Sequence, residues 1–235
     1  NALLPYGSQS QQTIIDRLLA LLCFIESRAL QVDILVIACN TASTSALEAI
    51  RPYTNIEVVG VVPAIKPACA ISKSKHIGLL ATPSTTKSRY TANLISTHSQ
   101  GTRVSLYGST TLVEIAEALF HTQILNEAKL AKVLSDLAIA EEIDVLVLGC
   151  THFPLLASAI SNYYKQRIIL IDSGKAIVVQ LPSFILIPVC GLPCSFSSKT
   201  KARPESAVSM AKMTCLPFPI FVGHIPATTV NSGGN

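Results

Sequence analysis

Five short aliphatic runs, each opened by a charged residue or a histidine, constrain the fold of this chain more than any other feature. The runs are Asp33 to Ala38, Glu57 to Val61, His76 to Ala81, Asp144 to Gly149 and Arg167 to Ile171. Runs of this length without alternation are typical of parallel strands that are buried on both faces. The chain has 235 residues, of which 49% are hydrophobic, so it is long enough to enclose such strands in a full core.

Segments with helical periodicity separate the aliphatic runs. In residues 11–30, Ile14, Leu18, Leu22 and Ile25 recur at the spacing of one helix face. Further helices are expected in residues 43–50, 86–95 and 127–142. The alternation predicts the α/β class with a parallel sheet, and ligands at the carboxyl ends of its strands.

Two of the runs repeat each other position by position. The segments Asp33 to Cys39 and Asp144 to Cys150 each consist of an aspartate, four aliphatic residues, a small residue and a cysteine. The residues that follow the two cysteines are polar: Asn40, Thr41, Thr151 and His152. We therefore expect two similar parallel-sheet α/β subdomains related by a pseudo-two-fold axis, with an active site between them.

Two thiols on opposite faces of a small substrate can perform acid–base chemistry. Inverting the α-carbon of an amino acid requires removal of a proton from one face and delivery of a proton to the other. Free cysteine has a pKa of about 8.5. Helices that begin directly after Cys39 and Cys150 are expected to lower this pKa through their N-terminal dipoles, so that one cysteine starts as thiolate and the other as thiol.

Each of these residues also has a structural interpretation. A single cysteine most often packs in a core, and Thr41 and Thr151 are suitable helix N-caps. His152 suits either a helix cap or a hydrogen bond to a thiolate or to a substrate carboxylate. The repetition of the cysteine frame favours the catalytic interpretation.

Composition and charge exclude several function classes. The seven cysteines are an odd number in a long chain, which predicts free thiols and not a disulfide framework. Three of the four net positive charges lie beyond residue 181, so no nucleic-acid partner is expected. No apolar run reaches the roughly 18 residues of a membrane span. A secretory signal is not recognised either, which predicts a cytoplasmic protein without a membrane partner.

A thiol-redox or zinc protein is a further class to weigh. It would use either Cys190 and Cys194 or Cys150 and His152. Neither set has the ligand spacing of a known zinc site. No metal site is therefore expected.

The character of the sequence changes beyond Leu181. Residues 182–235 hold seven of the thirteen prolines and show no hydrophobic period. We expect an atypical tail there, which can be a divergent extension, a disordered segment or the product of a reading-frame shift. The first subdomain is expected in residues 1–60, with residues 173–181 as candidates to complete it, and the second in residues 61–172.

The segments around the two cysteines carry a family resemblance. From its first residues to about Gly174, the chain resembles the glutamate racemases of the aspartate/glutamate racemase family. The resemblance rests on Leu4-Pro-Tyr-Gly-Ser, Val36-Ile-Ala-Cys-Asn-Thr-Ala-Ser, Gly60-Val-Val-Pro-Ala-Ile-Lys-Pro-Ala, Leu79-Leu-Ala-Thr-Pro-Ser-Thr, Leu112-Val-Glu-Ile-Ala-Glu and Leu148-Gly-Cys-Thr-His-Phe-Pro-Leu-Leu. The two cysteine motifs are the most specific of these.

The resemblance implies a cofactor-independent enzyme that interconverts L-glutamate and D-glutamate for peptidoglycan synthesis. It assigns the proton transfers to Cys39 and Cys150, supported by His152 and by Glu117, with Glu114 as the alternative to Glu117. It assigns substrate binding to Tyr6, Gly7, Asn40, Thr41, Thr85, Thr151 and His152. It further implies that no pyridoxal phosphate or metal takes part, that glutamate is the small-molecule partner, and that a homodimer is a candidate assembly.

The chain departs from the family pattern at both ends. Family members begin with a strand and an Asp-Ser-Gly turn ahead of the Pro-Tyr-Gly segment, and they finish with a helix that packs on the first domain. The resemblance assigns this aspartate to assist the first cysteine. A fragment or degraded copy that only binds an amino acid or a protein partner is therefore one alternative, and a racemase of aspartate or another amino acid is a second.

Overall fold

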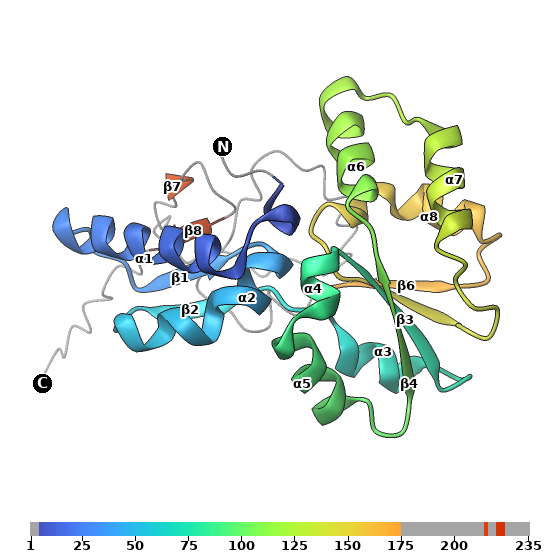
Figure 1. Cartoon of the computed structure of the whole chain (residues 1–235), viewed down its shortest axis with the longest axis horizontal. Coiled ribbons are helices and arrows are strands. Elements are labelled where there is room, and N and C mark those ends of the chain that lie inside the picture. The colour runs from blue at the N-terminus through green and yellow to red at the C-terminus, as the bar shows by residue number, and fades with distance from the viewer. Residues whose placement is uncertain (1–4, 175–213, 216–219, 224–235) are drawn as a thin grey trace, which may run out of the picture.

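The computed structural model describes residues 5–174, 214–215 and 220–223. In it the chain folds into two four-stranded sheets flanked by helices (Figure 1). The first sheet has the order β2-β1-β8-β7. Its strands are β1 (Ile34–Ile37), β2 (Glu57–Gly60), β7 (Thr214–Cys215) and β8 (Ile220–Gly223). The second has the order β4-β3-β5-β6. Its strands are β3 (His76–Ala81), β4 (Arg103–Gly108), β5 (Val145–Leu148) and β6 (Ile169–Asp172).

The strands that the aliphatic runs predict pair in parallel with their sheet neighbours among those runs. Strand β1 is parallel to β2, and β3, β4, β5 and β6 form a fully parallel sheet. Every residue of β1 and β5 is buried, which explains why these strands read as continuous aliphatic runs. The predicted α/β class is confirmed.

Strand β8 joins the first sheet in the opposite direction. It pairs antiparallel with β1, with Ile34 opposite Gly223 and Ile37 opposite Ile220. Part of the expected atypical tail thus extends the first sheet, which is mixed. Residues 175–181, among the candidates to complete the first subdomain, and residues 182–213 lie outside the described residues. The predicted boundaries at residues 60 and 172 stay predictions.

Helices cover the two sheets and build three hydrophobic clusters. Helices α1 (Gln11–Ser27) and α2 (Asn40–Ile50) pack on β1 in the first cluster. Helices α6 (Thr111–Thr122), α7 (Glu127–Asp136) and α8 (Ala157–Tyr163) pack against one face of the second sheet. Helices α3 (Ile65–Ile71) and α5 (Arg89–His98) cover its other face. The short elements are η1 (Tyr6–Ser8), η2 (Arg51–Tyr53), α4 (Pro83–Lys87) and η3 (Phe153–Leu156).

Two predicted helices differ from those observed. The segment 86–95 contains a break at Ser88, whose backbone is extended and whose Oγ accepts a hydrogen bond from the Thr91 amide at 3.0 Å. Ser88 therefore caps a new helix, as serine commonly does. The helix predicted in residues 127–142 ends at Asp136, close to Ala138, which has a φ of 45°. A backbone in the left-handed region cannot continue an α-helix.

Strand β4 was not expected from the sequence. It forms an edge of the second sheet, begins with the exposed Arg103, and leaves Leu106 45% exposed. An edge strand with exposed side chains does not need a continuous aliphatic run. The rule that finds buried parallel strands therefore misses it.

The aspartate that begins the second cysteine frame anchors the turn before β3. The Asp144 carboxylate accepts hydrogen bonds from Ser72 Oγ at 2.7 Å, from Ser74 Oγ at 2.9 Å, and from the amides of Lys73 and Ser74 at 2.6 and 3.0 Å. Burial alone would raise the pKa of this carboxyl, but the hydrogen bonds outweigh burial and lower the pKa to about 2.

We expect the Asp144→Asn substitution to remove a pH-dependent part of the stability. The folded-state pKa of about 2 lies below the value of about 3.9 for an unfolded aspartate. The stabilisation is therefore present above pH 4 and is lost as the pH falls toward 2. Urea unfolding between pH 2 and pH 7 measures it.

In that experiment, the free energy of unfolding of the wild-type chain should fall more steeply below pH 4 than that of Asp144→Asn. The control is Asp136→Asn, which removes an exposed ion pair with Lys132 and should preserve the wild-type pH profile. Parallel profiles for the wild type and Asp144→Asn would contradict the prediction.

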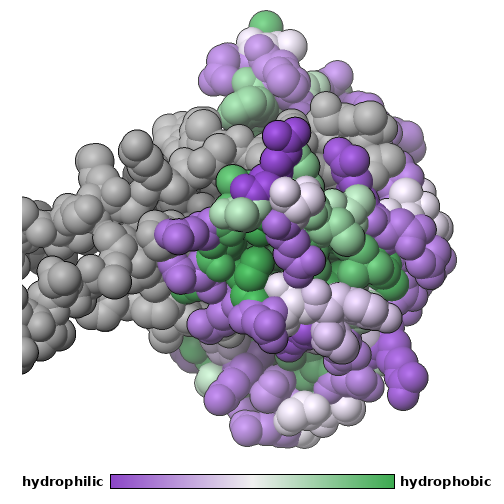
Figure 2. Space-filling model, turned by 90° about the vertical axis from the view of Figure 1, so that its left-hand side faces the viewer, coloured by the Kyte–Doolittle hydropathy of each residue, from purple (hydrophilic) through white to green (hydrophobic). Residues whose placement is uncertain are grey.

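The surface of the first half mixes hydrophobic and hydrophilic side chains. Seen from the side that lies at the left in Figure 1, hydrophobic surface is enclosed by hydrophilic residues (Figure 2). Large apolar side chains of this half are exposed at Phe24, Leu30 and Tyr53, and the guanidinium of Arg28 lies over the Phe24 ring. Within the described ranges, no helix combines the length and the apolar composition that crossing a membrane requires.

Candidate active site

Cys39 lies at the junction of β1 and α2. It is the second residue after β1 and the N-cap of α2, and its Sγ accepts a hydrogen bond from the Ala42 amide at 3.5 Å. Its side chain keeps partial exposure, whereas Asn40 and Thr41 behind it are buried. The expectation that Thr41 caps the helix is wrong, because Cys39 itself occupies the cap position.

Cys150 stands in the same place in the second sheet, as the second residue after β5. The chain then makes a turn and the 3-10 helix η3, and α8 begins only at Ala157. The helix expected directly after Cys150 is thus replaced by a turn. Thr151 lies partly exposed in this turn, and the N-cap of η3 is His152, whose side chain makes no capping hydrogen bond.

The two thiols do not have the lowered pKa values that the sequence suggests. Burial raises the pKa of Cys39, although hydrogen bonds from Ala42 and Thr41 act in the opposite direction. Burial also raises the pKa of Cys150 to about 12, against the hydrogen bonds from the amides of His152 and Phe153. The expectation of lowered values is therefore wrong, because desolvation of the thiolate exceeds the hydrogen bonds.

The two thiols lie within electrostatic reach of each other. A negative charge on Cys39 contributes to the raised pKa of Cys150. A thiolate at one cysteine therefore favours a neutral thiol at the other. This is the unequal protonation that transfer of a proton between two such groups requires.

Cys150, His152 and Glu117 form a line of polar contacts. Cys150 Sγ lies 3.7 Å from His152 Nδ1, and His152 Nε2 lies 2.5 Å from Glu117 Oε1. A carboxylate only accepts hydrogen bonds, so His152 Nε2 carries the proton and donates it. In a neutral ring, Nδ1 is then free to accept the Cys150 proton, whereas in an imidazolium Nδ1 donates to the thiolate.

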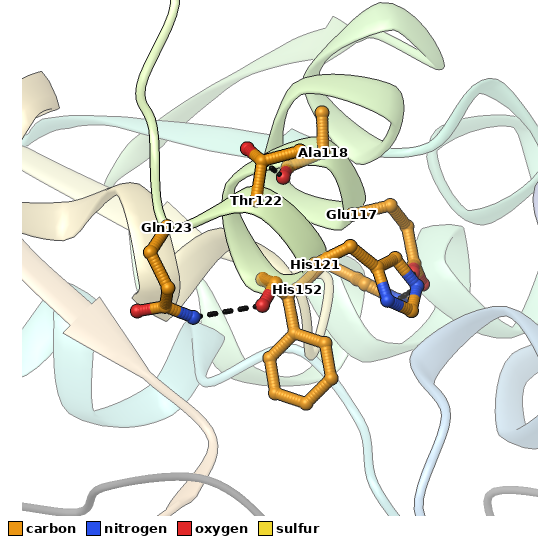
Figure 3. A network of polar contacts seen from close by, with 7 residues as sticks. Glu117, Ala118, His121, Thr122, Gln123 and His152 are labelled. Atoms are coloured by element: carbon orange, nitrogen blue, oxygen red, sulfur yellow. Dashed lines mark hydrogen bonds and ion pairs between the residues drawn. The ribbon is translucent and has the colours of Figure 1, made fainter.

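Glu114, the other glutamate of α6, pairs with a lysine and not with His152. Glu114 Oε2 lies 3.2 Å from Lys129 Nζ on α7, and its side chain is 62% exposed. Glu117, one helical turn further, is the glutamate that reaches His152 (Figure 3). The geometry thus favours Glu117 over Glu114 as the partner of the histidine.

Three threonine hydroxyls meet where the two halves of the chain contact each other. Thr41 Oγ1 lies 2.9 Å from Thr82 Oγ1 and 3.2 Å from Thr85 Oγ1, and Thr82 and Thr85 are 3.1 Å apart. Thr41 belongs to α2, and the other two belong to the turn that starts α4. Thr82 was not among the predicted site residues, although its position directly after β3 obeys the same strand-end rule.

The Tyr6-Gly7 segment packs against this threonine cluster. Tyr6 is buried, and its pKa is raised to about 12, mainly by burial and further by the charge of Cys39. A Cβ added at Gly7 would lie 2.9 Å from Thr82 Cβ, closer than side-chain atoms approach, and Ser84 Oγ donates to the Gly7 carbonyl at 2.7 Å. Glycine at position 7 therefore permits the two halves to touch.

Asn40 carries a donor without a partner. Asn40 is 2% exposed. No hydrogen-bond partner is found for its buried Nδ2 among the described residues. An unpaired buried amide costs about 1–3 kcal/mol. A buried donor without a partner calls for an explanation, and the acceptor of a bound ligand fits the place of Asn40 directly after Cys39.

The zinc class weighed from the sequence used either Cys150 and His152 or Cys190 and Cys194. In the part of the chain that the structure describes, no group of three His, Cys, Asp or Glu residues is placed to hold a metal ion. Cys190 and Cys194 lie outside the described residues. Cys23, Cys39, Cys69 and Cys150 are free thiols.

Comparison with known proteins finds close relatives for most of the chain. Residues 1–181 match the Asp/Glu/Hydantoin racemase family. The chain is 49% identical to a glutamate racemase of Shewanella frigidimarina over 177 residues, which are 75% of this chain and 68% of the relative. It is 48% identical to a glutamate racemase of Shewanella sp. strain MR-7, over 79% of this chain and 67% of the relative.

Solved structures show the same relationship. The Escherichia coli glutamate racemase, crystallised with L-glutamate and the activator UDP-MurNAc-ala, aligns with a TM-score of 0.68 at 39% identity, over 75% of this chain and 66% of that one. The Aquifex pyrophilus glutamate racemase aligns with a TM-score of 0.62 at 32% identity, over 79% of this chain and 71% of that one. The chain thus spans about two thirds of the length of these relatives. The chain belongs to the Asp/Glu/Hydantoin racemase family.

Proposed function

We propose that this chain is a glutamate racemase in which Cys39 and Cys150 exchange protons with opposite faces of the substrate α-carbon. The observation that carries the proposal is the equivalent placement of the two thiols. Each is the second residue after a buried parallel strand, and each lies within electrostatic reach of the other. The names of the relatives support glutamate as the substrate.

The raised thiol pKa values suit this reaction. The α-proton of an amino acid is very weakly acidic, so a strong base is needed to remove it. Burial destabilises the thiolate and thereby makes it a stronger base than cysteine in water. In one direction Cys39 removes the proton as thiolate and Cys150 supplies a proton as thiol, and in the other direction the roles are reversed.

His152 and Glu117 support the second cysteine in this proposal. In the direction in which Cys150 is the base, His152 Nδ1 takes the Cys150 proton, which converts the thiol–imidazole pair into a thiolate–imidazolium pair. Glu117 stabilises the imidazolium through Nε2. The described residues around Cys39 instead supply hydrogen bonds from Ala42 and Thr41, so the two halves of the site activate their thiols differently.

The remaining site residues are proposed to hold the substrate. Asn40 Nδ2 supplies an unpaired donor for a carboxylate oxygen. The hydroxyls of Thr41 and Thr85 supply further donors, because each can accept a hydrogen bond from a neighbouring threonine hydroxyl and direct its own proton to a ligand. The backbone turns that carry Tyr6, Gly7 and Thr151 complete the proposed contacts. A cytoplasmic location, a role in peptidoglycan synthesis and a homodimer belong to the same proposal.

Circular dichroism of the purified chain with L-glutamate tests the function. We expect the signal of the amino acid to decay to zero, because the two enantiomers are equally stable and the equilibrium mixture is racemic. The Cys39→Ala/Cys150→Ala double variant is the control and should leave the signal constant.

The same assay separates the alternatives. Decay with L-aspartate but not with L-glutamate would assign the chain to another substrate. A folded chain that binds glutamate in titration calorimetry but leaves its optical activity unchanged would be a binding protein, and the racemase proposal would be wrong.

A further inference from the structure

A second histidine shares the carboxylate that supports the site. His121 lies four residues after Glu117 on α6, and its Nε2 is 3.4 Å from Glu117 Oε2. The other oxygen of the same carboxylate, Oε1, receives the hydrogen bond from His152. Figure 3 shows the imidazole of His121 beside the carboxylate of Glu117 on the last turns of α6.

We propose that His121 is a positioning residue that holds the second oxygen of Glu117 and adjusts, through its own charge, how strongly Glu117 supports an imidazolium at His152. This inference rests on the proposed racemase function. It adds to that function a residue that the sequence motifs do not include, and one that does not touch the substrate.

The end of α6 holds His121 in place. Gln123 adopts a left-handed conformation with a φ of 58°, and its Nε2 donates to the Phe120 carbonyl at 2.8 Å. Thr122 Oγ1 donates to the Ala118 carbonyl at 2.7 Å (Figure 3). The ring of Phe120 also contacts the His121 ring edge to face, with centroids 5.5 Å apart. These contacts close the last turn and hold the backbone of His121 one helical turn from Glu117, while the His121 side chain itself is 70% exposed.

Further ionisable groups stand on α6, on α7 and in the turn ahead of η3. On α6, Glu114 is paired with Lys129 of α7 at 3.2 Å. On α7, Lys132 and Asp136 pair with each other at 3.2 Å, and Glu127 stands at the first turn. From the turn ahead of η3, the ionisable groups that face Glu117 are His152 and, beyond it, Cys150. His121 is thus the basic side chain that shares Glu117 with His152.

The charge on His121 changes how strongly the Glu117 carboxylate stabilises a positive charge on His152. Histidine changes its charge between about pH 5 and pH 8. A protonated His121 satisfies part of the negative charge of Glu117 and repels a positive charge on His152, so it disfavours the thiolate–imidazolium pair at Cys150. A neutral His121 leaves the full carboxylate charge to His152. Activity should therefore carry a pH dependence that belongs to His121.

Two substitutions fix the charge at this position. His121→Gln is neutral at every pH and keeps an amide that can donate to Glu117, whereas His121→Lys is positive throughout the range. We expect kcat/KM of His121→Gln to exceed that of the wild type about two- to fivefold at pH 6 and to match it at pH 8.5. We expect His121→Lys to fall about two- to fivefold below the wild type at pH 8.5 and to lie closer to it at pH 6. These factors are those of an exposed ion pair.

The outcomes distinguish this role from a structural one. A purely structural contact would change kcat/KM by the same factor at every pH, and equal profiles for the two variants would overturn the proposal. Lys129→Ala is the matched control, because it frees Glu114, the glutamate one turn before Glu117. His98→Gln, at the end of α5, controls for the loss of a histidine. Both controls should retain the wild-type profile.

A second measurement does not depend on activity. The Nε2 proton of His152 lies in a hydrogen bond of 2.5 Å to Glu117 and should give a far-downfield proton NMR signal, identified by its loss in His152→Gln. At pH 6 the wild-type signal should lie closer to that of His121→Lys than it does at pH 8.5, where it should lie closer to that of His121→Gln. This pattern in a chain that does not racemise would refute only the proposed function. Identical signals in all three proteins would refute the role of His121.

Discussion

The Cys150→Ala variant is expected to racemise glutamate at least about 10³-fold more slowly than the wild type. It should nevertheless still remove the α-proton of one enantiomer. General acid–base groups commonly contribute about 10²- to 10⁴-fold, and here one of two obligatory groups is removed. Cys39 remains and can still remove the proton of one enantiomer. Because no acid stands on the opposite face, the carbanion can only be reprotonated on the face from which the proton left.

Hydrogen exchange in D₂O makes this half-reaction visible. Cys150→Ala should introduce deuterium at the α-carbon of one enantiomer without inverting it, and Cys39→Ala should do so with the other enantiomer. Mass spectrometry measures the exchange, and circular dichroism of the protein verifies the fold. Racemisation by Cys150→Ala at the wild-type rate, or exchange of the same enantiomer by both variants, would contradict the two-thiol mechanism.

The His152→Ala variant is expected to lower kcat about 10²-fold with a smaller effect on KM. Without the imidazole, the Cys150 proton loses its acceptor at 3.7 Å, and Glu117 loses the ring through which it acts. The pKa of Cys150, already raised to about 12, then governs the thiolate directly. Steady-state kinetics in both directions measures the change.

Controls for His152 follow from the geometry of α6. Glu117→Gln keeps the shape of the side chain but removes its charge, and should reduce kcat by about tenfold, within the range of a single supporting group. Glu114→Gln alters the same helix without contacting His152 and should be neutral. Added imidazole should partly restore His152→Ala. Unchanged kcat in His152→Ala would show that the contact with Cys150 has no role in proton transfer.

The buried parts of the fold could be predicted from the sequence because burial determines residue type directly. Strands β1 and β5 have no exposed position, so only aliphatic residues fit them. Edge strand β4 is partly solvated, and its mixed sequence carried no comparable pattern. The break at Ser88 could not be found from hydrophobic periodicity, because it depends on a local hydrogen bond from the Thr91 amide.

The residues of the candidate site could be named from the sequence, but their electrostatics could not. Motif spacing places Cys39 and Cys150 at equivalent strand ends, and the structure agrees. The direction of the thiol pKa shifts depends on how much protein surrounds each sulfur, which is a property of the packed chain. Contacts between distant segments, such as Thr41 with Thr82, likewise require the tertiary structure.

The unequal surroundings of the two thiols have a consequence for the free enzyme under the proposed mechanism. Each turnover leaves the cysteines with exchanged protonation, so the protein that releases D-glutamate is ready for D-glutamate and must be reset before it accepts L-glutamate again. Cys150 has a histidine and a partly exposed carboxylate that lead toward solvent, whereas Cys39 has hydrogen bonds from an amide and a hydroxyl. Transfer of a proton between Cys150 and solvent through His152 would then limit the rate at high concentrations of a single enantiomer. Until that transfer, the free enzyme would keep the protonation state left by the enantiomer it released last.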